Sequence, residues 1–150
     1  MTRKIALYLD TSIPSALFQK PDERKEITNK FFNEYLPDYD IYISDFVVEE
    51  IKATPEETLR NKISNVIKDF NILTQTTKAE DLANEYLKFL KIPDIDSLHI
   101  AIATVEGMNY LVTWNMEHIA REKIRRVSDN VNFLYREHRL YIVTPKDLLD

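Results

Sequence analysis

The stretch KIALYLDTS, residues 4–12, is an apolar run that ends at Asp10 and is followed by two hydroxyl side chains. Continuous apolar runs are typical of strands that are buried on both faces, as in a parallel sheet. The run is too short for the apolar segment of a signal peptide. We therefore expect the chain to begin with a buried parallel strand whose carboxyl end carries Asp10, Thr11 and Ser12.

The composition is that of an ordinary globular protein and excludes several kinds of site. Of the 150 residues, 44% are hydrophobic and 30% are charged, which suits one domain over residues 1–150. The lack of cysteine excludes disulfides and thiolate-bound metals, and the single glycine, Gly107, excludes glycine-rich phosphate loops. No apolar run approaches the roughly 20 residues that cross a bilayer. We expect a cytoplasmic protein without a membrane partner.

The formal net charge is −5, whereas proteins that hold nucleic acid through non-specific charge are usually basic. Bulk electrostatics therefore argue against a simple nucleic-acid coat. A nucleic-acid enzyme is not excluded, because carboxylates that bind metal ions count as negative charge until their cations arrive.

Helices and strands alternate along the rest of the chain, which predicts an α/β fold with a mainly parallel central sheet and helices on both faces. Further strands are predicted at 40–44, 110–113 and 140–145, with a short strand or extended link at 71–76. Helices are predicted at 22–36, from Asp45, from Pro55 to Phe70, at 77–90, from Ile95 to Gly107, at 116–126 and at the C-terminus.

Oxygen-bearing side chains follow several of these strands close to the point where each strand ends. Ligands of doubly wound sheets bind outside the carboxyl ends of the strands, so we expect these side chains to meet at one edge. They are Asp10 after the first strand, Glu49 and Glu50 in the helix after the second, Asp96 in the first turn of its helix, and Asn115 and Glu117 after strand 110–113.

This set of ligands favours a particular chemistry. Carboxylates that gather repel one another, which raises their pKa values unless a cation neutralises them. Oxygen ligands, with no cysteine and only three histidines in the chain, favour Mg²⁺ or Mn²⁺ over zinc. Such ions activate water and neutralise charge on a phosphodiester. The pattern favours metal-dependent phosphodiester hydrolysis.

Each of these acids also has an ordinary structural interpretation. Asp10 could cap the turn after its strand, and Glu49 and Glu50 could face solvent. Asp96 could stabilise the first turn of its helix, although Asp94 is better placed to cap it. The case for a site therefore rests on the recurrence of acids at strand ends.

Four segments resemble, in this order, the PIN-domain family, which includes the VapC-like toxins of toxin–antitoxin pairs. They are YLDTSIPSAL (8–17), ISDFVVEEI (43–51), IDSLHIAIA (95–103) and LVTWNMEHI (111–119). The C-terminal LYIVTPKDLL is also similar, so the resemblance spans essentially the whole chain. It implies a three-layer α/β/α PIN-like fold and a Mg²⁺- or Mn²⁺-dependent ribonuclease. RNA would be the substrate, and a cognate antitoxin and a homodimer are candidate partners.

The resemblance also implies roles for individual residues. Asp10 matches the first metal ligand of the family, Glu50 its helix glutamate and Asp96 its third acid. Thr113 matches a Thr or Ser that helps to order the site. The residues expected to support the ligands are Thr11, Ser12, His99, Thr113 and Glu117.

The fourth acidic position departs from the family pattern. The family commonly has an Asp two residues after the matching Thr, where this chain has Asn115. An Asn carbonyl can bind a metal or orient a water but brings no charge, so Glu117 could supply the missing carboxylate. His99 lies one turn after Asp96 and could hydrogen-bond it or play a structural role.

Local positive charge comes from the segment REKIRR in the helix predicted at 116–126. Arg121 and Arg125 share one face of that helix, and Lys123 lies elsewhere around it. These residues either form an ordinary solvated surface or contact RNA phosphates beside the acidic edge. Trp114 either packs in the core or stacks on a base.

The sequence therefore predicts a metal-dependent endoribonuclease, the toxin of a toxin–antitoxin pair, with Asp10, Glu50, Asp96 and Asn115 as catalytic metal ligands. The alternative is a catalytically weakened PIN fold that binds RNA or protein, which Asn115 motivates. A more remote alternative is another Mg²⁺-dependent phosphohydrolase in which Asp10 is the nucleophile.

Overall fold

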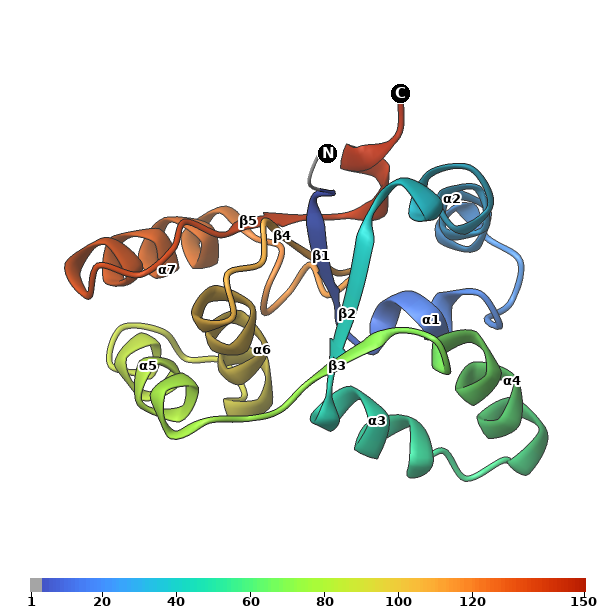
Figure 1. The fold of residues 1–150 in the computed structure, drawn as a ribbon, viewed down its shortest axis with the longest axis horizontal. Helices are drawn as coiled ribbons and strands as arrows, with labels where there is room; N and C mark the ends of the chain where they lie inside the picture. The colour runs from blue at the N-terminus through green and yellow to red at the C-terminus, as the bar shows by residue number, and fades with distance from the viewer. Residues whose placement is uncertain (1–3) are drawn as a thin grey trace.

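The computed structural model describes residues 4–150, which form a sheet between two layers of helices (Figure 1). The strands of this part of the chain are β1 (Ala6–Leu9), β2 (Asp40–Ser44), β3 (Asn71–Leu73), β4 (Tyr110–Val112) and β5 (Tyr141–Val143). Their order across the sheet is β3-β2-β1-β4-β5, and all neighbours run parallel. The predicted three-layer α/β fold is confirmed.

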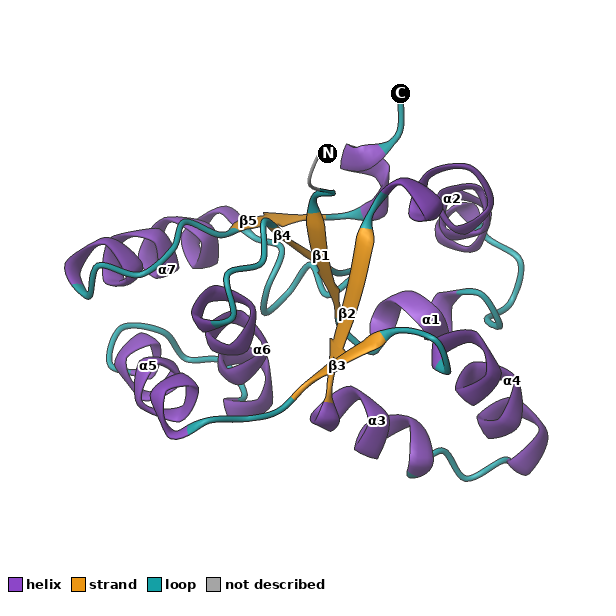
Figure 2. Cartoon of the chain, in the orientation of Figure 1, coloured by secondary structure: helices purple, strands orange, loops and turns teal. Residues whose placement is uncertain are grey.

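Helices cover both faces of the sheet (Figure 2). In Figure 1, the first four helices lie on one side of the sheet and the last three on the other. The helices of residues 4–150 are α1 (Ser12–Ala16), α2 (Glu23–Lys30), α3 (Asp45–Lys52), α4 (Glu57–Ile67), α5 (Thr77–Leu87), α6 (Asp94–Val105) and α7 (Glu122–Leu134). A π-helical turn, Phe31–Tyr35, and short 3-10 helices, Leu36–Asp38 and Pro145–Leu148, complete them.

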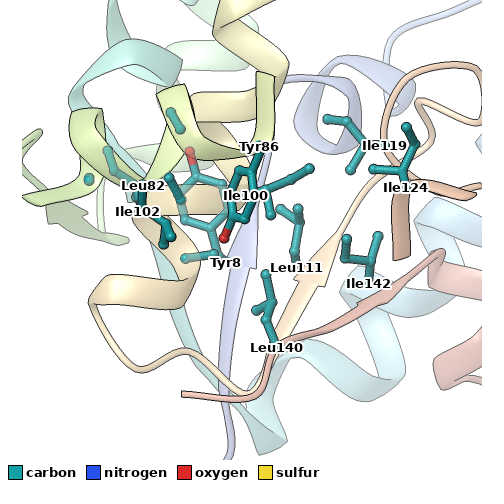
Figure 3. Packing of buried hydrophobic residues seen from close by; sticks show 14 of the residues in the cluster. Tyr8, Leu82, Tyr86, Ile100, Ile102, Leu111, Ile119, Ile124, Leu140 and Ile142 are labelled. Carbon is teal, nitrogen blue, oxygen red and sulfur yellow. The ribbon is translucent and has the colours of Figure 1, made fainter. Parts of the chain in front are cut away.

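Alternate side chains of β1 enter two separate cores. Leu7 and Leu9 pack with residues of α1, α3 and α4, whereas Tyr8 packs with residues of α5, α6 and α7. Figure 3 shows Tyr8 beside Tyr86 and Ile100 in the second core. All three β1 side chains are fully buried, and burying one such side chain contributes about 1.5–3 kcal/mol. The apolar run at the N-terminus therefore fixes the centre of the fold, as predicted.

The order of the strands places β1 at the point where the sheet changes direction. The chain runs from β1 outward to β2 and β3, then returns to β4 on the other side of β1 and continues to β5. The carboxyl ends of β1, β2 and β4 are therefore neighbours. This switch point is where doubly wound sheets bind their ligands.

The helix predicted at 116–126 was wrong at its start and its end, because α7 begins at Glu122 and runs to Leu134. Residues 116–121 form turns instead. The main-chain carbonyl of Asn115 accepts hydrogen bonds from the N–H groups of Ile119 (3.2 Å) and Ala120 (2.8 Å). Those bonds close a turn before a helix can start.

One short helix was missed, and one expectation about a helix start was wrong. The short helix α1, directly after Asp10, was not predicted, because five residues are too few to show a helical period. Asp94 does not cap α6, because Pro93 occupies the cap position and Asp94 is already helical. The Asp94 carboxylate lies in the first turn, where it favours the helix dipole.

Within residues 4–150, each helix is too short or too polar to cross a membrane.

Candidate functional site

The buried carboxylate of Asp10 lies directly after β1 and is held by three hydrogen bonds. Its Oδ1 accepts from the backbone N–H of Ser12 (3.1 Å) and from the Ser12 hydroxyl, and its Oδ2 accepts from the Thr113 hydroxyl. The Ser12 hydroxyl in turn accepts from the N–H of Trp114 (2.9 Å). Asp10 therefore does close the turn after its strand, and this turn also ties the ends of β1 and β4 together.

Burial controls the ionisation of Asp10, of which only 4% is exposed. Burial raises its pKa, and the nearby His99 and the hydrogen bonds from Ser12 and Thr113 offset only part of that rise. The negative charge of Asp10 is thus disfavoured by its surroundings. A cation at this place would remove that penalty.

Glu50 belongs to the same edge through His99. The Glu50 Oε1 lies 3.5 Å from His99 Nε2, and the side chain of Glu50 is 44% exposed. The hydrogen bond from His99 lowers the pKa of Glu50, against the smaller opposing effect of burial. Glu50 therefore stays ionised, and the preceding Glu49 faces solvent.

Of the two interpretations of His99, the structure does not show the hydrogen bond to Asp96. His99 is buried between elements, with Nε2 toward Glu50 and Nδ1 at 2.6 Å from the Tyr8 hydroxyl. The Tyr8 hydroxyl donates to the Ser44 hydroxyl (2.8 Å). His99 acts on Asp96 only through its charge. Its role here is to link β1, β2, α3 and α6, which agrees with the structural interpretation of this histidine.

Asp96 lies in the first turn of α6, only 8% exposed, and contacts a residue that was not predicted. His118 Nδ1 lies 3.2 Å from Asp96 Oδ2. Burial raises the pKa of Asp96, and His99, His118 and the Asn115 side chain lower it by smaller amounts. The spacing Asn-x-x-His was the available signal, because an Asn side chain often closes a turn onto the residues that follow it.

The supporting residues differ in how closely they approach the acids. Ser12 and Thr113 contact Asp10 directly. The Thr11 hydroxyl is shielded from solvent and has no hydrogen-bond partner within the described chain. Glu117 is 82% exposed and reaches the site only through His118 Nε2, at 3.6 Å.

The helix predicted to carry Arg121 and Arg125 on one face begins later, at Glu122. Arg121 lies before α7, and both Arg121 and Lys123 are exposed to solvent. Arg125 Nε donates to the main-chain carbonyl of Ile142 (2.9 Å), so this side chain fastens α7 to β5. Contact between these three residues and RNA stays a prediction.

Trp114 is packed rather than presented to solvent. Its Nε1 donates to the Thr28 hydroxyl (2.9 Å), and the guanidinium of Arg24 lies over the ring at 5.3 Å. The hydrogen bond to Thr28 and the contact with Arg24 therefore favour the packed interpretation over base stacking.

The donor set suits a hard cation in its chemistry. Asp10, Glu50 and Asp96 supply carboxylate oxygens, and the first and last have pKa values that burial raises. In residues 4–150, however, no three acidic or histidine side chains already lie close enough to share one ion. The carboxylate oxygens are ligands of the type that Mg²⁺ or Mn²⁺ prefers, and binding would require the carboxylates to move closer together.

Comparison with solved structures finds the same fold in bacterial toxins. Mycobacterium tuberculosis VapC20, a sarcin–ricin loop cleaving toxin, has 16% identity and a TM-score of 0.57 over 70% of this chain and 86% of its own. A toxin–antitoxin complex from Klebsiella pneumoniae has 19% identity and a TM-score of 0.60, over 78% of this chain and 92% of its own. VapBC2 from Rickettsia felis, bound to a DNA fragment from its promoter, has 20% identity and a TM-score of 0.56, over 93% of this chain and 98% of its own.

No curated protein matches the chain. The PIN domain family model, in contrast, matches residues 7–121, which contain β1 from Leu7 onward, β2 to β4 and every predicted metal ligand. The fold and this match agree. The chain therefore belongs to the PIN domain family.

Proposed function

We propose that this protein is a metal-dependent endoribonuclease that hydrolyses RNA phosphodiester bonds and acts as the toxin of a toxin–antitoxin pair. The observation that carries the proposal is the buried Asp10, held by Ser12 and Thr113 at the switch point of the sheet. Membership of the PIN domain family supports it, as does the likeness in fold to a toxin that cleaves the sarcin–ricin loop.

In this proposal, Asp10, Glu50 and Asp96 hold Mg²⁺ or Mn²⁺, and Asn115 lies beside Asp96. The bound ion would activate water and neutralise charge on the phosphodiester. Ser12 and Thr113 keep both Asp10 oxygens oriented before any ion arrives. His99 keeps Glu50 ionised, so that its carboxylate is available to the ion or to the attacking water.

The proposed RNA substrate is supported by exposed basic residues, and the proposed antitoxin partner by the similar structures. The exposed Arg121 and Lys123 are candidates for contacts with RNA phosphates, which would supply positive charge that the acidic chain lacks overall. Two of the similar structures are toxin–antitoxin assemblies, which supports a cognate antitoxin as partner. A homodimer, a cytoplasmic location and one domain over residues 1–150 remain parts of the proposal carried by the sequence.

Cleavage of a structured RNA tests the function. Wild type with added Mn²⁺ or Mg²⁺ is compared with wild type in EDTA and with Asp96→Asn. We expect cleavage only by wild type with metal, and a loss of at least about 100-fold in the variant, since an outer-shell change alone costs 10–100-fold. Equal cleavage in all three samples would reveal a contaminating nuclease and defeat the proposal.

A catalytically weakened PIN fold that binds RNA or protein is the second candidate. The neutral Asn115 and the lack of a preassembled three-ligand cluster among residues 4–150 favour it. Calorimetric titration with Mn²⁺ separates the two candidates. The nuclease releases or absorbs heat on binding the ion, whereas an inert fold that still binds RNA gives no metal signal.

A further inference from the structure

Asn115 uses its side-chain oxygen and its main-chain groups on the turn that follows β4. Its Oδ1 accepts from the backbone N–H of His118 (3.0 Å), and its own N–H donates to the Thr113 hydroxyl (2.9 Å). Its main-chain carbonyl accepts from Ile119 and Ala120. An Asn side chain that accepts from the backbone a few residues later stabilises a turn. The oxygen predicted to face a metal is therefore already engaged.

The turn places His118 beside Asp96 in the first turn of α6. His118 Nδ1 lies 3.2 Å from Asp96 Oδ2, and the His118 side chain is 34% exposed. Its other nitrogen, Nε2, faces Glu117, whose side chain extends into solvent. Asp96 itself is largely buried, and the Asn115 side chain also reaches its carboxylate.

We propose that His118 is a positioning residue of the metal centre, which orients the Asp96 carboxylate through Nδ1, and that Asn115 acts by holding His118 rather than by binding the ion. This inference rests on the proposed function. Carboxylates that bind metals are themselves held by outer hydrogen bonds, and losing one costs about 10–100-fold in metal affinity. At the position where relatives carry a fourth acid, this chain would thus use an imidazole that acts through Asp96.

Three substitutions of His118 test which nitrogen matters. The amide nitrogen of Asn occupies a place similar to imidazole Nδ1, whereas that of Gln is closer to Nε2. Calorimetric titration with Mn²⁺ gives the dissociation constant of each variant. We expect His118→Ala and His118→Gln to weaken Mn²⁺ binding by about 10-fold or more, and His118→Asn to stay within about 3-fold of wild type. His138→Ala, at an exposed histidine, is the matched control and should not change the constant.

A double-mutant cycle tests the part assigned to Asn115. If Asn115 acts through His118, the variant that combines Asn115→Ala with His118→Ala binds Mn²⁺ no more weakly than His118→Ala alone. If Asn115 binds the ion itself or acts on Asp96 directly, the two losses multiply, and this part of the inference is wrong. Circular dichroism and thermal unfolding of every variant confirm that the fold is kept.

The remaining outcomes separate the inference from the function on which it rests. Wild type that binds Mn²⁺ no better than His118→Ala and His118→Gln overturns the role of His118 but leaves the metal centre standing. If His118→Asn weakens Mn²⁺ binding and His118→Gln does not, the proposed role of Nδ1 is overturned as well, because Nε2 would then be the nitrogen that matters. Wild type that binds no Mn²⁺ overturns both.

Discussion

Two clusters of buried polar side chains in this protein differ in charge. The interior cluster consists of Tyr86, Thr104 and Asn132, and joins α5, α6 and α7. The Tyr86 hydroxyl donates to the Asn132 side chain, whose amide donates to the Thr104 hydroxyl at 3.4 Å. Burial raises the pKa of Tyr86, so its hydroxyl stays neutral at neutral pH. Each of these side chains has a partner, and the cluster as a whole carries no charge.

The edge cluster, made of Asp10, Glu50, Asp96, His99 and His118, is built differently. Burial raises the pKa of Asp10 and of Asp96, so the folded chain disfavours the charges that it brings together. The two histidines compensate only in part. Neutral groups that satisfy one another hold a fold together, whereas buried charges left without full compensation indicate a site for a ligand.

The largest expected effect comes from removing one charge of the edge cluster. Asp10→Asn should lower RNA cleavage by at least about 100-fold, because the carboxylate is a proposed ligand. It should not lower the free energy of unfolding of the metal-free protein in proportion, because burial disfavours that charge. Cleavage rates and urea unfolding measure the two effects. Full activity in this variant would make Asp10 a turn residue only.

The opposite pattern is expected in the interior cluster. Tyr86→Phe removes the donor to the buried Asn132 side-chain oxygen, which costs about 1–3 kcal/mol of unfolding free energy. The melting temperature should then fall by about 2–4 °C for each kcal/mol. Tyr141→Phe, at a half-exposed tyrosine, is the control and should stay within about 0.5 kcal/mol. A loss of Mn²⁺ affinity in Tyr86→Phe would erase the distinction between the clusters.

The dependence of stability on pH sharpens the comparison further. Because the pKa of Asp10 is raised, the folded state binds its proton more tightly, and stability falls as pH rises through the interval between the ordinary and the raised pKa. Glu50 acts in the opposite sense, because its pKa is lowered, and its contribution is lost as pH falls through the folded-state pKa.

Urea unfolding in EDTA between about pH 4 and about pH 7 measures this effect. We expect Asp10→Asn to gain stability relative to wild type as pH rises. A difference between the two proteins that does not vary with pH would show that burial of Asp10 costs nothing.

The smallest effect is expected at the outer margin of the edge cluster. Glu117 is largely exposed and pairs with His118 at 3.6 Å, so Glu117→Gln should change the Mn²⁺ dissociation constant by less than about 2-fold. Calorimetric titration beside wild type gives this ratio. A loss of 10-fold or more would identify Glu117 as the carboxylate that replaces the family's fourth acid.

The sequence predicted those features that depend on local pattern. The apolar run before Asp10 indicated the buried β1, and the alternation of elements indicated a parallel sheet with its site at the carboxyl ends. The carboxyl ends of parallel strands meet at one edge, which predicted that the segments around Ser12 and Thr113 lie near Asp10. The structure shows hydrogen bonds from both residues to Asp10.

Features set by pairing across the fold were missed. The contacts of His99 with Tyr8 and Glu50 join residues that are far apart in the chain, and no spacing along α6 reveals them. The late start of α7 depends on hydrogen bonds that Asn115 makes in a turn, and the same turn brings His118 to Asp96.

Thermal unfolding with and without Mn²⁺ tests most directly whether the edge cluster is a metal centre. A ligand that binds only the folded state at about 100 times its dissociation constant adds about 2.7 kcal/mol of stability. We predict that Mn²⁺ raises the melting temperature of wild type and of Tyr86→Phe alike, and leaves that of Asp10→Asn unchanged. An equal rise in Asp10→Asn, or no rise in wild type, would contradict the account.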